Sequence, residues 1–170
     1  MKSSEEPPKD WFAWAEAEIA DWKARAAVPD ETFSPEAVRV VELAARAARS
    51  LGHNYVGAEH LLAGIMKQGS GAGVAALERA GLTLPGLREE IESGQPSVPR
   101  QSSAGSIPYT PRWKGIIQRA RTCARGAGAR VEVDDLLREL LVEKEGLPAD
   151  IFRRRAIDVE KLRAELDLPG

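Results

Sequence analysis

The 170-residue sequence lacks the features of several kinds of protein. It has a single cysteine, Cys123, so no intramolecular disulfide can form, which fits a reducing compartment. Charged residues interrupt every apolar stretch before it could span a bilayer. The acidic, proline-containing N-terminus differs from a signal peptide, which would be basic and then apolar. We therefore expect a cytoplasmic protein that does not enter a membrane.

Motifs for catalysis are also missing. The chain contains no G-x-x-x-x-G-K-[ST] phosphate loop, which excludes that mode of ATP binding. His53, Glu59 and His60 form the one cluster that suggests catalysis, but the H-E-x-x-H spacing of a zinc site is absent. Neighbouring positions on a helix, such as 59 and 60, point in different directions. We expect no enzyme activity, no cofactor and no metal site.

The net charge of −2 gives no overall attraction to nucleic acid or to an anionic membrane. Acidic residues are in excess in residues 1–32, and Lys and Arg are in slight excess in residues 109–170. This basic excess leaves one alternative open, a regulatory protein that binds nucleic acid through the second half of the chain.

What the sequence does contain is an internal repeat with an offset of 76 residues. Residues 33–52 read FSPEAVRVVELAARAARSLG, and residues 109–128 read YTPRWKGIIQRARTCARGAG. Each copy opens with an aromatic residue, a hydroxyl residue and proline, which is typical of a helix start because the hydroxyl caps free N–H groups and proline needs no N–H there. A glycine, Gly52 or Gly128, ends each predicted helix.

The apolar residues of both copies follow the three-and-four spacing of one helix face. In the first copy they are Ala37, Val40, Val41, Ala44, Ala47, Ala48 and Leu51. In the second copy they are Trp113, Ile116, Ile117, Ala120, Cys123, Ala124 and Ala127, so Cys123 is predicted to be a buried small residue.

The repeat continues through three further helices in each copy, and no segment has the pattern of a strand. The second copy is one residue shorter, and we place this difference in the glycine-rich turn at residues 69–73. The predicted fold is all-α, with two pseudo-symmetric four-helix repeats. Its parts are an N-terminal arm (1–32), repeat 1 (33–92), a Ser/Gly/Pro-rich linker (93–108) and repeat 2 (109–170).

The N-terminal arm contains three of the four tryptophans, Trp11, Trp14 and Trp22, in a segment with helical spacing. Such an amphipathic helix can bind a partner groove through its aromatic anchors. It can also pack on the repeats of its own chain as an extra helix, which is the interpretation we favour for so small a protein.

The string LGHNYVGAEHLLAGIM (51–66), flanked by FSPEAVRVVELAARAA and GAGVAALERAGL, resembles the Clp N-terminal repeat. This repeat occurs as a tandem pair at the front of Hsp100/Clp AAA+ unfoldases such as ClpA, ClpB and ClpC. The resemblance extends over residues 33–168 and is weaker in repeat 2. It implies a non-catalytic module of protein quality control that binds protein substrates, adaptors, or Clp ATPase or peptidase subunits. We expect the protein to be a monomer.

The resemblance also implies a specific ligand. In the ClpC branch the N-domain recognises phosphoarginine, with a hydroxyl residue near the phosphate and a glutamate near the guanidinium. Transferred to this chain, site one consists of Ser34 and Glu59, and site two of Thr110 and Asp135. The competing interpretation, which the sequence favours, is that the hydroxyls are plain helix caps and the acids complement helix dipoles.

Overall fold

The computed structural model describes residues 29–94 and 107–167, and within these ranges the chain is all-α, as predicted. Repeat 1 contains α2 (Pro35–Ser50), α3 (Ala58–Gln68), α4 (Ala72–Arg79) and α5 (Leu84–Gly94). Repeat 2 contains α6 (Pro111–Gly126), α7 (Val133–Val142), α8 (Leu147–Arg154) and α9 (Val159–Asp167). The predicted tryptophan-rich helix lies outside the described residues. No helix in the described ranges is long and apolar enough to cross a membrane.

The first helix of each repeat begins as the sequence predicts. The Ser34 hydroxyl accepts a hydrogen bond from the Ala37 N–H (3.1 Å), and the Thr110 hydroxyl accepts one from the Trp113 N–H (3.2 Å). A proline follows each cap at the first helical position. Since each hydroxyl satisfies a backbone donor that the helix leaves free, both residues are confirmed as N-caps.

The apolar face of α6 differs from the prediction near its C-terminal end. Cys123 is exposed, so its predicted burial is wrong, and the Arg121 side chain is buried there instead. At 3.6 residues per turn, position 121 lies only about 60° around the helix from the buried Ala124, whereas position 123 lies about 100° away. The buried stripe therefore continues through position 121.

The one-residue difference between the repeats also lies elsewhere than predicted. Gly52 and Gly128 are 76 residues apart, but the N-caps of α3 and α7, Gly57 and Glu132, are 75 apart. Repeat 2 therefore lacks one residue in the loop before α7. The deletion does not lie in the turn that follows α7. Asp134 consequently takes the position of Glu59.

The two repeats are joined at both of these loops. Phe33 pairs with Val131, and Val56 pairs with Tyr109, each as an isolated parallel bridge. In the second bridge the Thr110 N–H donates to the Val56 carbonyl at 3.0 Å. Each repeat therefore begins its first helix against the loop that precedes the second helix of the other repeat.

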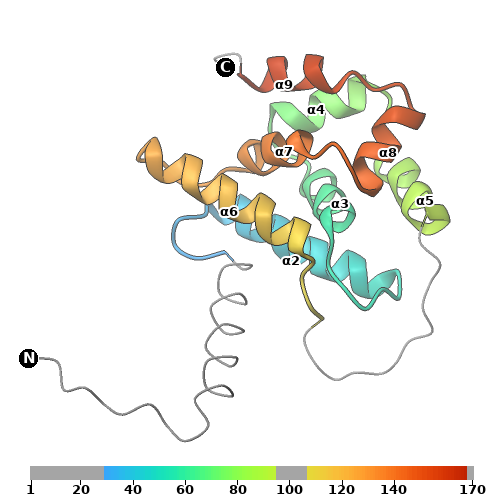
Figure 1. The fold of residues 1–170 in the computed structure, drawn as a ribbon, viewed down its shortest axis with the longest axis horizontal. Coiled ribbons are helices and arrows are strands. Elements are labelled where there is room, and N and C mark those ends of the chain that lie inside the picture. The colour runs from blue at the N-terminus through green and yellow to red at the C-terminus, as the bar shows by residue number, and fades with distance from the viewer. Residues whose placement is uncertain (1–28, 95–106, 168–170) are drawn as a thin grey trace, which may run out of the picture.

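The helices of the two repeats interleave around one core (Figure 1). The central helix α3 contacts α2 and α5 of its own repeat and α6, α7 and α8 of the other. The third and fourth helices exchange partners, since α4 packs against α9 and α5 packs against α8. One continuous cluster of buried apolar residues runs through both repeats, so in this part of the chain they share a single core.

Candidate functional site

A groove of about 510 Å³ lies where three helices begin. Its lining comes from the start of α3 (Tyr55, Ala58 and Glu59), the start of α6 (110–112) and the start of α8 (146–148). Its volume is in the range of ligand-binding pockets in proteins. Since α3 belongs to repeat 1 and the other two helices to repeat 2, the groove exists only because the repeats interleave.

The bridge between Val56 and Tyr109 places Thr110 and Glu59 on this same groove. The pairs predicted from the sequence, Ser34 with Glu59 and Thr110 with Asp135, each lie within a single repeat. The structure combines one residue from each pair. Periodicity within a repeat does not reveal a contact between repeats.

Glu59 gives the groove an acidic group. Glu59 lies in the first turn of α3 and is only 7% exposed. Its carboxylate occupies the space beside Gly57, where an added Cβ would lie 2.7 Å from Oε2. The Tyr55 hydroxyl is buried near this carboxylate. Burial, and then the nearby negative charge of Glu59, raise the pKa of Tyr55, so its hydroxyl keeps its proton.

The starts of α6 and α8 add positive charge to the groove. The N-termini of α6 and α8 both contribute to the lining, and the positive end of a helix dipole favours an anion. Arg112, the second residue of α6, adds a guanidinium that donates from Nε to the Glu143 carboxylate at 3.2 Å. In the sequence, Arg112 is only one of the Lys and Arg residues that are in slight excess in residues 109–170. Its position at the start of α6 was the signal that it belongs to the site.

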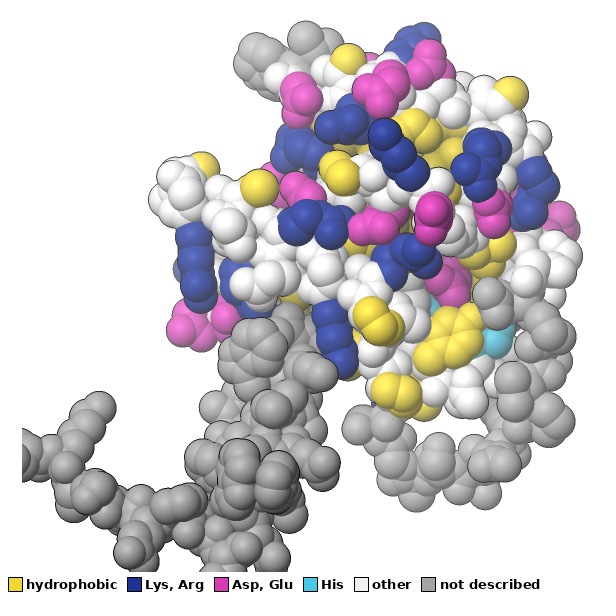
Figure 2. All heavy atoms as spheres, in the orientation of Figure 1, with side chains coloured by type: hydrophobic (Ala, Val, Ile, Leu, Met, Phe, Trp, Pro, Cys, Tyr) yellow, Lys and Arg dark blue, Asp and Glu magenta, His cyan; other side chains and the backbone are white. Residues whose placement is uncertain are grey.

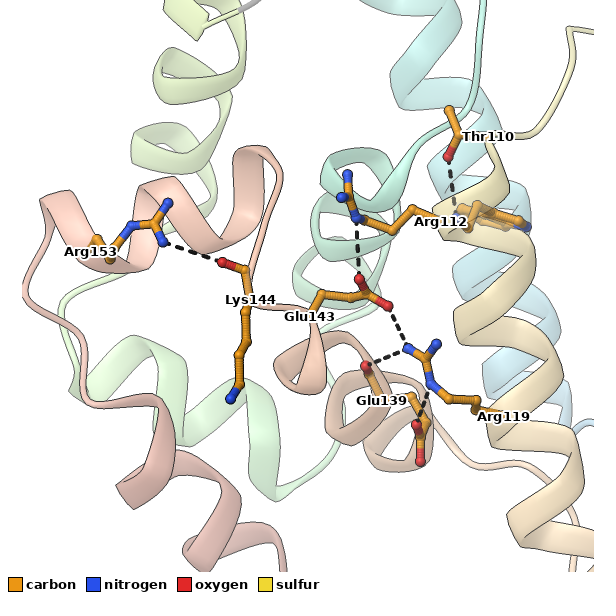
Figure 3. A network of polar contacts seen from close by, with 8 residues as sticks. Thr110, Arg112, Arg119, Glu139, Glu143, Lys144 and Arg153 are labelled. Atoms are coloured by element: carbon orange, nitrogen blue, oxygen red, sulfur yellow. Dashed lines mark hydrogen bonds and ion pairs between the residues drawn. The ribbon is translucent and has the colours of Figure 1, made fainter.

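A network of polar contacts holds Arg112 through Glu143 (Figure 3). Glu143 lies between two arginines, accepting from Arg112 at one oxygen and from Arg119 Nη2 at the other, at 2.6 Å. Arg119 also donates from Nε to Glu139 at 3.0 Å. The network ties α6 to α7 and holds the start of α6 in place.

Ser34 and Asp135 have other roles in the structure. Ser34 is 3% exposed, and its N–H donates to the Val131 carbonyl at 2.9 Å. The Asp135 carboxylate accepts from the Glu132 N–H at 2.8 Å and pairs with Arg138 at 2.8 Å. Neither residue lines the groove. Their assignment to a ligand stays a prediction.

Asp134, which occupies the position of Glu59 in repeat 2, accepts from the Gly73 N–H at 3.1 Å, at the start of α4. The residue that matches Gly73 in repeat 2 is Pro148 at the start of α8, and proline has no N–H to offer. Glu59 therefore cannot form the equivalent bond, and it lines the groove instead.

The two histidines form a structural hydrogen-bond chain. The Gly57 N–H donates to His60 Nδ1 at 2.9 Å, so the proton of this ring is on Nε2, which lies 2.7 Å from His53 Nδ1. Burial, and then the neighbouring His53, lower the pKa of His60 to about 3. The chain ties the loop before α3 to that helix. No group of three or more metal-binding side chains occurs in residues 29–94 and 107–167.

Cys123 is exposed on α6, and its thiol lies 3.7 Å from the Glu139 carboxylate. The negative charge of Glu139 is the largest of the effects that raise the pKa of this thiol. A reactive cysteine needs the opposite environment, one that stabilises the thiolate. The surroundings of Cys123 do not activate it.

Two interleaved four-helix repeats around one core, with a polar groove at their junction, define a double-repeat helical domain. The Clp repeat (R) N-terminal domain family matches residues 32–137, and the chain belongs to that family. This confirms the resemblance seen in the sequence.

Relatives with 139 aligned residues, 80% of this chain, include two Clp proteins. One is an ATP-dependent Clp protease ATP-binding subunit ClpA homolog from Cyanidium caldarium, at 38% identity. The other is the chloroplastic chaperone protein ClpC from Pisum sativum, at 34% identity. The chain spans only about 16% and 15% of their lengths.

Two solved structures share the fold. The N-terminal domain of the caseinolytic protease associated chaperone ClpD from Arabidopsis thaliana has a TM-score of 0.67 and 21% identity, over 80% of this chain and 92% of that one. The Hsp104 N-terminal domain from Candida albicans has a TM-score of 0.63 and 17% identity, over 79% and 88% of the two chains.

Proposed function

We propose that this chain is a non-catalytic protein-binding module of a Clp-type unfoldase or protease system. It holds substrate proteins or adaptors through the groove between α3, α6 and α8. The observation that supports this most is that Glu59 of repeat 1 and Thr110 and Arg112 of repeat 2 line the same groove. Membership of the Clp repeat family supports protein quality control as the process in which such a groove would act.

The ligand that best fits this arrangement is a phosphoarginine side chain on a marked protein. Its guanidinium would pair with Glu59, because charge-assisted bonds between carboxylate and guanidinium are among the stronger polar contacts. Its phosphate would lie at the start of α6, near Thr110, where the helix dipole favours an anion. The groove thus uses one predicted residue from each of the two sites that the sequence suggested.

The nucleic-acid alternative has less support. On the face seen in Figure 2, Lys and Arg side chains alternate with Asp and Glu. Arg119 pairs with Glu139 and Glu143, and Arg138 pairs with Asp135. Paired cations release few counterions from a phosphate backbone, and such release dominates affinity for DNA and RNA. The cytoplasmic location, the monomeric state and a Clp ATPase or peptidase partner remain predictions.

A titration of the full chain with free phosphoarginine, followed by NMR chemical shifts, tests the proposal. We expect saturable shifts around the starts of α3 and α6, and a loss of affinity of about ten-fold or more in Glu59→Gln, because a charge-assisted pair becomes a neutral one. Thr110→Ala should also weaken binding, with a small loss of stability from the missing cap.

The matched control is Glu42→Gln, which removes an exposed carboxylate of α2 outside the groove and should leave affinity unchanged. No shift at millimolar phosphoarginine, or equal affinities for Glu59→Gln and Glu42→Gln, would rule out this use of the groove.

A further inference from the structure

We infer that Arg112 makes the groove selective for phosphorylated over unmodified arginine side chains. This inference rests on the proposed function and names the residue that determines its specificity. Arg112 lines the groove at the start of α6, and its side chain is 37% exposed. It is thus accessible to a ligand and also attached to the protein by its ion pair with Glu143.

The way in which Arg112 is paired leaves its ligand-binding atoms available. Glu143 accepts from Nε, at 3.2 Å, and the two terminal nitrogens form no hydrogen bond within residues 29–94 and 107–167. A guanidinium presents its terminal N–H donors in a planar fork that matches the oxygens of a phosphate. The side chain therefore offers a fork whose orientation is already set.

Because Gly146 has no side chain, the Arg112 guanidinium can lie beside the start of α8. A Cβ at position 146 would lie 2.7 Å from Arg112 Nη1, so any larger residue would displace the guanidinium. The backbone at Gly146 has φ 94°, a conformation that also favours glycine. The N-terminus of α8 and the Arg112 guanidinium consequently lie side by side in the groove.

Glu143 and Arg119 act as positioning residues. Glu143 accepts from both arginines, and Arg119 is bound in turn to Glu139, so the carboxylate that holds Arg112 is itself fixed. Holding a donor in its bound orientation lowers the entropy lost when a ligand binds. The network shown in Figure 3 thus orients the Arg112 guanidinium.

Selectivity follows from charge. The phosphate of phosphoarginine would receive hydrogen bonds from the Arg112 fork and lie near the starts of α6 and α8. An unmodified arginine on Glu59 would bring a second cation toward Arg112 with no anion between them, which is repulsive. The same side chain therefore attracts the marked ligand and disfavours the unmarked one.

The test is the ratio of the dissociation constants for free arginine and free phosphoarginine, measured by calorimetry on the full chain. We expect Arg112→Gln to weaken phosphoarginine binding on the order of ten-fold and to leave arginine binding equal or tighter, so that the ratio falls by that factor. Glu143→Gln should lower the ratio less, because Arg112 keeps its charge and loses only its orientation. Arg112→Lys should restore part of the ratio, since lysine returns the charge without the fork.

Arg138→Gln is the matched control. Arg138 also bridges two carboxylates and is 32% exposed, but it lies outside the groove, so this variant should keep the wild-type ratio. A wild-type ratio in Arg112→Gln, with binding still lost in Glu59→Gln, would overturn this inference and leave the proposed function in place. Failure of the wild-type protein to bind phosphoarginine would overturn both.

Discussion

At the scale of the residue, His60 shows how a buried side chain ties stability to pH. Its ring is fully buried, and Nδ1 accepts from the Gly57 N–H. Protonation of Nδ1 would turn this acceptor into a donor that faces another donor. The folded state therefore needs the neutral ring, and burial, followed by the neighbouring His53, lowers the pKa of His60 to about 3.

We predict that the protein loses stability on acidification between pH 6.5 and pH 3. In this window the unfolded chain, whose histidine has the ordinary pKa of 6.5, binds a proton that folded His60 rejects. The free energy of unfolding should fall by up to about 1.4 kcal/mol per pH unit for this group. Urea titrations at pH 7 and pH 5 measure the change.

His60→Asn is the control, because asparagine can accept the Gly57 N–H but does not titrate. This variant should be less stable at pH 7 and should lose less stability between pH 7 and pH 5. An equal loss in the wild type and the variant would show that His60 is not the responsible group.

At the scale of the element, the crossing of α2 and α3 depends on one glycine. A Cβ at Gly64 of α3 would lie 2.5 Å from the Val40 carbonyl oxygen and 3.0 Å from the Ala44 backbone nitrogen. Both atoms belong to the backbone of α2 and cannot turn aside as a flexible side chain can. The two helices therefore approach this closely only because position 64 has no side chain.

We predict that Gly64→Ala lowers the free energy of unfolding by about 2 kcal/mol, because the helices must separate to admit the methyl group. Gly126→Ala, at the end of α6, is the comparison. An added Cβ there meets nothing within 4 Å, and alanine should stabilise the protein by about 0.5 kcal/mol. Chemical unfolding of both variants checks this, and equal stabilities would refute the close crossing.

At the scale of the whole molecule, interleaving makes the two repeats one folding unit. α3 of repeat 1 contacts three helices of repeat 2, and the third and fourth helices of the repeats exchange partners. A repeat on its own would expose the apolar faces that these contacts bury, and so small a unit would have too little core to stay folded.

We predict that residues 29–94 and 107–167, expressed separately, lack cooperative thermal unfolding by circular dichroism. When mixed, they should recover helical signal and a cooperative transition. In a matched experiment, a protease site inserted between residues 95 and 106 of the full chain allows one cut, after which the two parts should elute together in size exclusion. Separate, stably folded halves would contradict the shared core.

Much of the fold could be predicted from the sequence, because the signals are local. The caps Ser34 and Thr110, the prolines that follow them and the stops at Gly52 and Gly128 each act within one helix turn. The repeat made the prediction stronger, since two copies repeat the same pattern. The wrong predictions concern features that depend on contacts between segments far apart in the sequence. Cys123 lies on α6, and the rotation of this helix against the core depends on the helices that pack on it. The shorter loop before α7 makes Asp134, and not Asp135, the residue of repeat 2 that corresponds to Glu59.

The sequence by itself determined the class of the protein: all-helical, twice repeated and of the Clp N-terminal type. Only the tertiary structure decided which residues form the groove, bringing Glu59 of repeat 1 to Thr110 and Arg112 of repeat 2. The physical reason is that helix caps and apolar periodicity are short-range properties of one segment. The pairing of Val56 with Tyr109 joins segments 53 residues apart, and such pairing is chosen by the burial of a core that both repeats build together.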